Sequence, residues 1–107
     1  MFTRVVEITI KSGKGKELSA TLNEKILPML KSQAGFMDEI TLISENDPNR
    51  VMALSFWKSK EDAERYQLET YPKVQDSMRH LLDDAPMVQT YNVDTSTTHR
   101  IAAGRAA

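Results

Sequence analysis

The chain has 107 residues, a formal net charge of −1 at pH 7, 40% hydrophobic and 27% charged residues, and no cysteine. These values are typical of one globular domain and exclude disulfides, thiolate catalysis and cysteine-based zinc sites. The balanced charge offers no basic patch for nucleic acids or acidic membranes, and no apolar run approaches the ~20 residues of a membrane span.

The first predicted strand covers residues 2–10. Its apolar side chains share one side with Arg4, while the other side is mostly polar, and this period of two with β-branched residues is typical of a strand. The segment lacks the basic start, apolar middle and small-residue cleavage site of a signal peptide, so we expect a cytoplasmic protein. A flexible turn with Gly13 and Gly15 follows.

An amphipathic helix is predicted next, because apolar side chains recur three or four apart over residues 18–30. Pro28 lies inside this pattern and lacks a backbone donor, so we expect a kink near Glu24 and Lys25. Gly35 then ends the segment as a C-cap or turn residue.

Two further strands, residues 36–44 and 51–57, are joined by a polar turn that contains Asn, Asp and Pro. So short a connection predicts an antiparallel hairpin. The second of these strands is apolar on both faces, with Met52, Leu54 and Phe56 alternating with Val51, Ala53 and Trp57. A strand with one face in water alternates more cleanly, so we expect apolar cover on each face.

The next segment predicts a helix in two pieces. Ser59 and Asp62 form a capping-box pattern at its start. Pro72 interrupts the helix, because the residue before a proline avoids helical angles while proline itself suits a first turn. We therefore predict helices over residues 60–69 and 72–83.

The last predicted strand covers residues 87–93 and completes the order β-α-β-β-α-β. This is the ferredoxin-like arrangement of the α+β class, with a four-stranded antiparallel sheet and both helices on one face. The apolar second face of strand 51–57 would then lie bare, so we expect a homodimer that packs sheet against sheet.

Three segments and the order of elements resemble the antibiotic biosynthesis monooxygenase (ABM) family. The segments are "AGF" at the second strand, "FWKSKEDAERY" across the third strand and its helix, and "PMVQTYNV" at the last strand. The resemblance covers residues 2–94 and implies the dimeric α/β-barrel superfamily. We expect an ABM-like domain over residues 1–94 and a C-terminal tail over residues 95–107.

The resemblance implies one of two chemistries, cofactor-independent oxygenation of phenols, quinols or anthrones, or oxidative haem degradation. The haem-degrading branch uses an asparagine in the first strand, a tryptophan on the second helix and a histidine further along. The corresponding positions hold Val5 or Val6, Tyr66 and Asp76, none of which matches or supplies the usual iron ligand. We therefore expect no haem, no other cofactor and no metal.

Four aromatic residues are the candidate site. Tyr66 and Tyr71 are the predicted catalytic residues, and Trp57, Tyr66 and Phe56 the predicted ligand-binding residues. The resemblance implies that the region of Tyr66 lines a pocket between helices and sheet, where a phenol could hold a substrate oxygen. Each has a structural alternative: core packing for Tyr66, packing at the barrel edge or dimer interface for Trp57, and turn packing for Tyr71.

The other ionisable candidates are weaker. His80 is the natural general base near neutral pH, but it lies about 100–200° from the buried stripe of its helix, which predicts a solvent-facing side chain. His80 and Asp83 could supply two metal ligands, yet no third ligand has suitable spacing. Glu7, Asp38 and Glu39 lie in strands, where a carboxylate either points into the covered region as a base or lies in water at an edge.

We predict a cofactor-independent monooxygenase that acts on a small aromatic substrate bound between helices and sheet. The alternative is a non-catalytic dimeric module of the same fold that binds a small molecule or serves assembly. A pocket of roughly several hundred Å³ lined by Tyr66 and a second polar group would favour a ligand site. An interior filled by Leu, Met and Phe side chains would favour the module.

Overall fold

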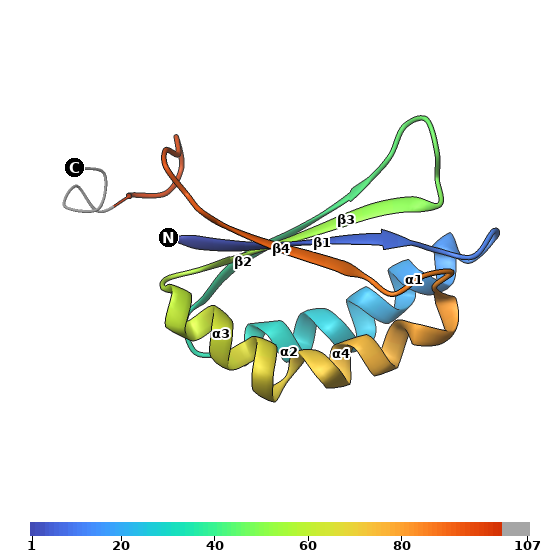
Figure 1. The fold of residues 1–107 in the computed structure, drawn as a ribbon, viewed down its shortest axis with the longest axis horizontal. Helices are drawn as coiled ribbons and strands as arrows, with labels where there is room; N and C mark the ends of the chain where they lie inside the picture. Colours follow the sequence, from blue (N-terminus) through green and yellow to red (C-terminus); the bar gives the residue numbers. More distant parts are fainter. Residues whose placement is uncertain (102–107) are drawn as a thin grey trace.

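A computed structural model describes residues 1–101 as two layers, a four-stranded sheet with the helices against one face (Figure 1). In chain order the elements are β1 (Phe2–Thr9), α1 (Gly15–Thr21), the π-helical turn η1 (Leu22–Ile26), α2 (Leu27–Lys31), β2 (Phe36–Ile43), β3 (Arg50–Trp57), α3 (Lys60–Glu69), α4 (Tyr71–Met78), the 3₁₀ turn η2 (Arg79–Leu81) and β4 (Met87–Asn92). The predicted order and the ferredoxin-like α+β fold are confirmed.

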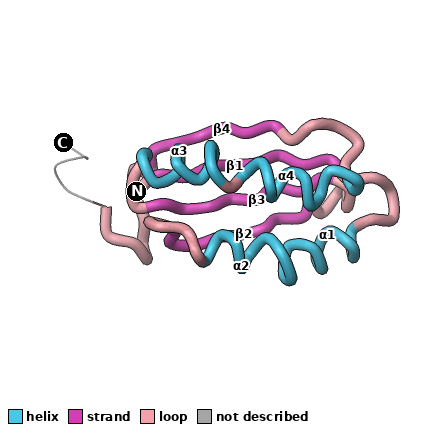
Figure 2. The backbone as a smooth tube through the Cα atoms, turned by 90° about the horizontal axis from the view of Figure 1, so that it is seen from below, coloured by secondary structure: helices cyan, strands magenta, loops and turns pink. Residues whose placement is uncertain are grey.

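The sheet has the strand order β2-β3-β1-β4, with every neighbouring pair antiparallel. Seen from the helix side, α1 and α2 form one run and α3 and α4 a second run beside it (Figure 2). The register pairs Phe2 with Trp57 and Arg4 with Ser55, so these four side chains share the face that the helices cover. Because side chains alternate along a strand, Phe56 lies on the opposite face.

The core fills the layer between sheet and helices. Its buried apolar residues come from β1, β3 and all the helical segments, and the largest with almost no exposure are Trp57, Ile10 and Leu81. The alternation of β1 predicted this division for that strand, since its residues on the helix side are buried and most of those on the other side are not.

The irregularity expected near Glu24 and Lys25 takes the form of the π-helical turn η1. The N–H of Leu27 bonds to the carbonyl of Leu22, five residues back, and Pro28 lies in the first turn of α2. Pro28 has no N–H for the usual bond four residues back, so a wider turn accommodates it.

The start of α3 is fixed by the predicted cap. Ser59 Oγ accepts a hydrogen bond from the backbone N–H of Asp62 at 3.2 Å. The Asp62 carboxylate packs against Gly35, which has φ of 81° and where a Cβ would collide with that carboxylate. Glycine is therefore required at this turn for both conformation and space.

The second helical piece differs from the prediction at both ends. It begins at Tyr71 because Pro72 occupies the first turn, where no N–H is needed, and the break falls at Thr70. The predicted end at residue 83 is wrong, since the helix stops at Met78 and tightens into η2. The N–H of Asp83 bonds to the carbonyl of Thr9, so pairing with the end of β1 draws the chain out of the helix.

The sheet face away from the helices carries exposed apolar side chains from several strands. They include Ile40 and Leu42 of β2 and Met87 and Tyr91 of β4, which are 44–59% exposed. With Met52, Leu54 and Phe56 they form what we call the open face. Helices cover one face of β3, and apolar cover of this second face stays a prediction.

The described part of the predicted tail, up to Ile101, contains neither helix nor strand, and residues 102–107 lie outside the described residues. Across residues 1–101, no helix has the length and apolar character needed to cross a membrane.

Ser59→Ala should lower the free energy of unfolding by about 1 kcal/mol, because the backbone N–H of Asp62 loses its acceptor. Urea denaturation measures the change, with Ser19→Ala, at an exposed position inside α1, as the control. Equal stability of Ser59→Ala and the parent would show that this cap does not stabilise α3.

Candidate functional site

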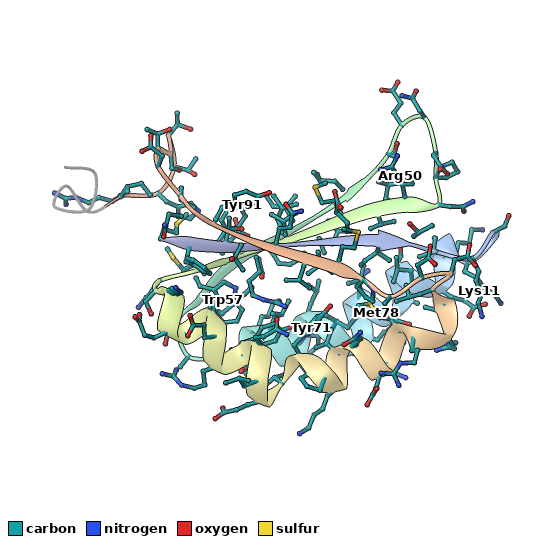
Figure 3. All side chains as sticks on the ribbon, in the orientation of Figure 1. Lys11, Arg50, Trp57, Tyr71, Met78 and Tyr91 are labelled. Atoms are coloured by element: carbon teal, nitrogen blue, oxygen red, sulfur yellow. The ribbon has the colours of Figure 1, made fainter. Side chains whose placement is uncertain are left out.

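A polar cluster lies within the layer between sheet and helices, centred on Arg4 of β1. Arg4 is only 2% exposed, although the neighbours that share its side of β1 are apolar. Figure 3 shows Trp57, Tyr71 and Met78 in the same layer, below the sheet and above the helices.

Three aromatic rings form a row from the end of β3 across α3 to α4. The rings of Trp57 and Tyr66 stack with centroids 4.9 Å apart, and those of Tyr66 and Tyr71 are 6.1 Å apart. The indole N–H of Trp57 donates to Ser55 Oγ at 2.9 Å, so Trp57 has its polar group satisfied inside the core. The helix break before Pro72 brings both tyrosines to this one layer.

The guanidinium of Arg4 lies over both tyrosine rings. Its central carbon is 4.9 Å from the centroid of Tyr66 and 4.5 Å from that of Tyr71, and Nη2 donates to Gln67 Oε1. The ion pairs formed within residues 1–101 do not include Arg4. Its positive charge is thus stabilised by two ring faces and one amide oxygen, and it forms no ion pair with a carboxylate in this part of the chain.

The tyrosines do not neutralise this charge. Burial raises the pKa of Tyr66 to about 12, against the opposing effect of Arg4, and burial also raises the pKa of Tyr71. Both are therefore neutral at pH 7. Burial lowers the pKa of Arg4, but arginine keeps its proton in proteins. Burial of an ion costs on the order of several kcal/mol, and a cation–π contact returns about 0.5–2 kcal/mol.

The hydroxyl of Tyr71 is buried and has no hydrogen-bond partner in the described part of the chain. The guanidinium carbon of Arg4 lies 4.5 Å from the centroid of the Tyr71 ring, close enough that Arg4 opposes the burial-driven rise of the Tyr71 pKa. A buried hydroxyl without a partner costs about 1–3 kcal/mol, so such groups are rare unless something else occupies the space beside them.

A small cavity of about 40 Å³ adjoins this cluster. Its polar lining comes from Arg4, Glu39, Ser55, Tyr66 and Tyr71, and aliphatic side chains complete the wall. A water molecule needs roughly 10–15 Å³ by this measure, so the cavity has room for about three waters. Most of the exposed lining is apolar, although Tyr66 and a second polar group are among the lining residues, and the volume is far below several hundred Å³.

Glu39 is the strand carboxylate that the fold turns toward the cavity. It pairs with Ser55 across β2 and β3 and so shares the helix-covered face. Burial raises the pKa of Glu39, against the opposing effect of a 2.6 Å hydrogen bond from the Thr41 hydroxyl. Asp38 and Glu7 lie on the opposite face of the sheet.

A second, wider hollow of about 590 Å³ lies at the far end of the open face. Glu7, Leu42, Arg50, Met52 and Met87 are among the residues that line it. It lies beside the β2–β3 turn, which rises away from the helices (Figure 1). Arg4, Tyr66 and Tyr71 are not among the residues that line it.

The predicted site residues divide between the two faces. Trp57, Tyr66 and Tyr71 come together, whereas Phe56 lies on the open face and cannot line the same cavity. His80 is exposed, as its helical position predicted. Within residues 1–101, no three His, Asp or Glu side chains gather in a way that could hold a metal ion.

Sequence reasoning missed Arg4 as a site residue. The signal was present, since the strand pattern put this one charge on the same side as four apolar residues. Its partners lie more than 60 positions away in the sequence, on helices whose rotation no local pattern reveals.

The family model for antibiotic biosynthesis monooxygenases matches residues 1–71, which include β1 to α3 and end at Tyr71. No curated protein sequence matches the chain.

Solved structures of several proteins share the fold. SnoaB, a cofactor-independent oxygenase from Streptomyces nogalater, superposes with a TM-score of 0.77 at 15% identity, over 92% of this chain and 97% of that one. A protein from Nitrosomonas europaea assigned to the antibiotic biosynthesis monooxygenases gives 0.72 at 18% identity, over 87% and 98%. A Bordetella bronchiseptica protein of the same assignment gives 0.75 at 13% identity, over 86% and 95%. Since the family match covers more than half of the sequence, this chain belongs to the antibiotic biosynthesis monooxygenase family.

Proposed function

We propose that this protein is a monooxygenase that binds a small aromatic molecule between its helices and sheet and oxidises it with molecular oxygen, without a cofactor. The observation that carries the proposal is the buried cluster of Arg4, Tyr66 and Tyr71 beside a cavity, with a Tyr71 hydroxyl that lacks a partner. Family membership supports the reaction class. We propose the cytoplasm as its location, from the sequence alone.

The proposed chemistry suits a phenol-, quinol- or anthrone-like substrate. For an anthrone-like substrate, loss of a proton gives an enolate, which passes one electron to O₂. The resulting radical and superoxide combine and take up a proton to give a hydroperoxide. This loses water, so one oxygen atom becomes a carbonyl and the other leaves with the two hydrogens of the original CH₂ group. The protein needs to supply a dry site, a hydrogen-bond donor and a proton acceptor.

Residues of the cluster can fill these roles. The hydroxyls of Tyr66 and Tyr71 would donate hydrogen bonds to a substrate oxygen, and Trp57 stacks behind Tyr66 and fixes its ring. Glu39 would accept the proton, because its raised pKa brings it nearer to the pKa of an acidic phenol or enol.

A substrate ring needs more space than about 40 Å³, so the wall of the cavity must move when it binds. Leu22 and Ile26 in this wall belong to the π-helical turn η1, and Met78 ends α4. π-helical turns are frequent at functional sites, and methionine adapts its shape more readily than branched residues. We propose that this side of the cavity opens.

We also propose a homodimer that packs through the open face. Exposed apolar side chains of β2 and β4 continue the apolar surface of β3 there. Patches of this kind are typical of subunit interfaces, and a second copy of the sheet would cover this one face to face.

The small cavity favours one other function. At about 40 Å³ it also fits a non-catalytic dimeric module of the same fold, in which the Arg4 cluster holds a small ligand without turnover. Oxygen consumption separates the two functions.

We expect a screen of anthrones and quinols with an oxygen electrode to find turnover. Tyr66→Phe should lower kcat/KM by about fivefold to tenfold, the loss of one hydrogen bond of about 1 kcal/mol. Tyr91→Phe is the control, because it removes a hydroxyl on the open face. Equal kcat/KM in the two variants would remove Tyr66 from the site, and no oxygen uptake with any compound would favour the module.

Glu39→Gln should change how stability depends on pH. Because burial raises the folded-state pKa of Glu39, the folded protein holds this proton more tightly than the unfolded chain does. The free energy of unfolding of the parent should therefore fall as pH rises from about 4 through the folded-state pKa. The stability of Glu39→Gln relative to the parent should be greater at pH 7 than at pH 4, measured by urea denaturation.

Glu45→Gln, at an exposed loop position, is the control for this comparison. If the free energy of unfolding of Glu39→Gln depends on pH in the same way as that of the parent, Glu39 is not buried in a way that favours its neutral form.

Sedimentation at micromolar concentration should show a dimer of two 12.1 kDa chains. Ile40→Glu should shift it to monomer, since a charge on the open face would be buried between the sheets. Leu68→Glu is the control, because Leu68 is an exposed apolar residue of α3. A monomeric parent, or a dimer unchanged by Ile40→Glu, would contradict the proposed interface.

A further inference from the structure

We propose that Arg4 and the hydroxyl of Tyr71 form a binding site for one negatively charged oxygen, so that the protein holds its ligand as a monoanion. The chemical class is a phenolate, an enolate or a carboxylate on a planar organic molecule. The inference rests on the proposed function for the location of the ligand, and adds its charge and the residue that selects it.

The first argument is the charge of Arg4. Its guanidinium is 2% exposed, lies over two ring faces at 4.9 and 4.5 Å, and donates to Gln67. Both rings belong to neutral tyrosines, and over residues 1–101 no carboxylate comes within 4.0 Å of Arg4. A buried cation that is surrounded by neutral groups favours an anion in the adjoining space.

The second argument is independent of that charge. Tyr71 is 5% exposed, its hydroxyl has no partner in the described chain, and it lines the same cavity as Arg4. A hydroxyl is a hydrogen-bond donor that an anionic oxygen satisfies better than a neutral one. A cation without a carboxylate partner and a hydroxyl without a hydrogen-bond partner therefore line one small space.

The third argument is the size and total charge of the cavity. About 40 Å³ admits an ionised oxygen and the few atoms that bear it, with the rest of the ligand toward the wall of η1 and α4. The titratable groups that line it are Arg4 from β1, Glu39 from β2, Tyr66 from α3 and Tyr71 from α4. The site holds one cation and one carboxyl group, and ionisation of Glu39 would make it still less positive. It therefore suits a monoanion rather than a phosphate dianion.

A purely structural role for Arg4 makes a different prediction. If Arg4 only ties the sheet to α3 and α4, then Arg4→Met should destabilise the protein. If Arg4 is an anion site, Arg4→Met should leave the melting temperature unchanged or higher, since replacement of a buried charge by an apolar side chain of similar volume is often neutral or stabilising. Arg4→Met should also abolish the preference of the protein for anionic over neutral ligands.

The test uses 4-nitrophenol, whose ionised and neutral forms differ in absorbance, and 4-nitroanisole as a neutral molecule of similar shape. Trp57 is the chain's one tryptophan and stacks on Tyr66, so its fluorescence reports binding. We expect the full chain to bind the phenolate at least about tenfold more tightly than the phenol, which lowers the apparent pKa of the bound probe by about one unit or more. Affinity for 4-nitroanisole should be as low as for the phenol.

Arg4→Met should remove this pKa shift, and Arg4→Lys should keep part of it because the charge remains. Arg79→Met is the control, since Arg79 is exposed and paired with Asp76. Tyr71→Phe should weaken phenolate binding several-fold while affinity for 4-nitroanisole is unchanged. Displacement of the probe by benzoate would extend the site to carboxylates, and lack of displacement would restrict it to phenolates and enolates; both results keep an anion site.

The inference is overturned if 4-nitrophenolate does not bind, if 4-nitroanisole binds equally well, or if Arg4→Met retains the pKa shift. Oxygen uptake without a preference for anions would leave the proposed function in place and remove the anion site. Anion binding without oxygen uptake for any substrate would leave the site in place and remove the monooxygenase.

Discussion

The position of Arg4 over the rings of Tyr66 and Tyr71 is the contact on which the interior of this protein depends. It joins the centre of the sheet to both pieces of the second helical region, and it places a positive charge in a layer that is mostly apolar. A core built for stability alone would hold an aliphatic side chain at this position of β1, as it does at Val6 and Ile8. The cost of the buried charge is therefore best explained by what binds beside it.

The irregular parts of the helices serve the same region. The break at Thr70 with Pro72 lets Tyr66 and Tyr71 meet one guanidinium although they are five residues apart in the sequence, which a straight helix would place about 140° apart. On the other helical run, Leu22 and Ile26 of the π-helical turn supply part of the aliphatic wall of the cavity.

The sequence predicted the elements well because each depends on local chemistry: alternation for the strands, Ser59 for a helix start and Pro72 for the break. It also predicted that Tyr66 and Tyr71 converge, since the break is local. Phe56 and Trp57 were both predicted to bind the ligand, although the alternation of their strand puts them on opposite faces. The partners of Arg4, the cavity volume and the end of α4, which depends on the bond between Asp83 and Thr9, arise from long-range packing that no local pattern contains.

A crystal structure of the protein with bound 4-nitrophenol tests the central claim most directly. The account predicts the probe between helices and sheet, with its ionised oxygen about 2.7–3.2 Å from a guanidinium nitrogen of Arg4 and from the hydroxyl of Tyr71. It also predicts that Leu22, Ile26 and Met78 have moved apart to admit the ring. A probe bound instead in the wider hollow of the open face, with Arg4 paired to a carboxylate of the protein, would contradict the account.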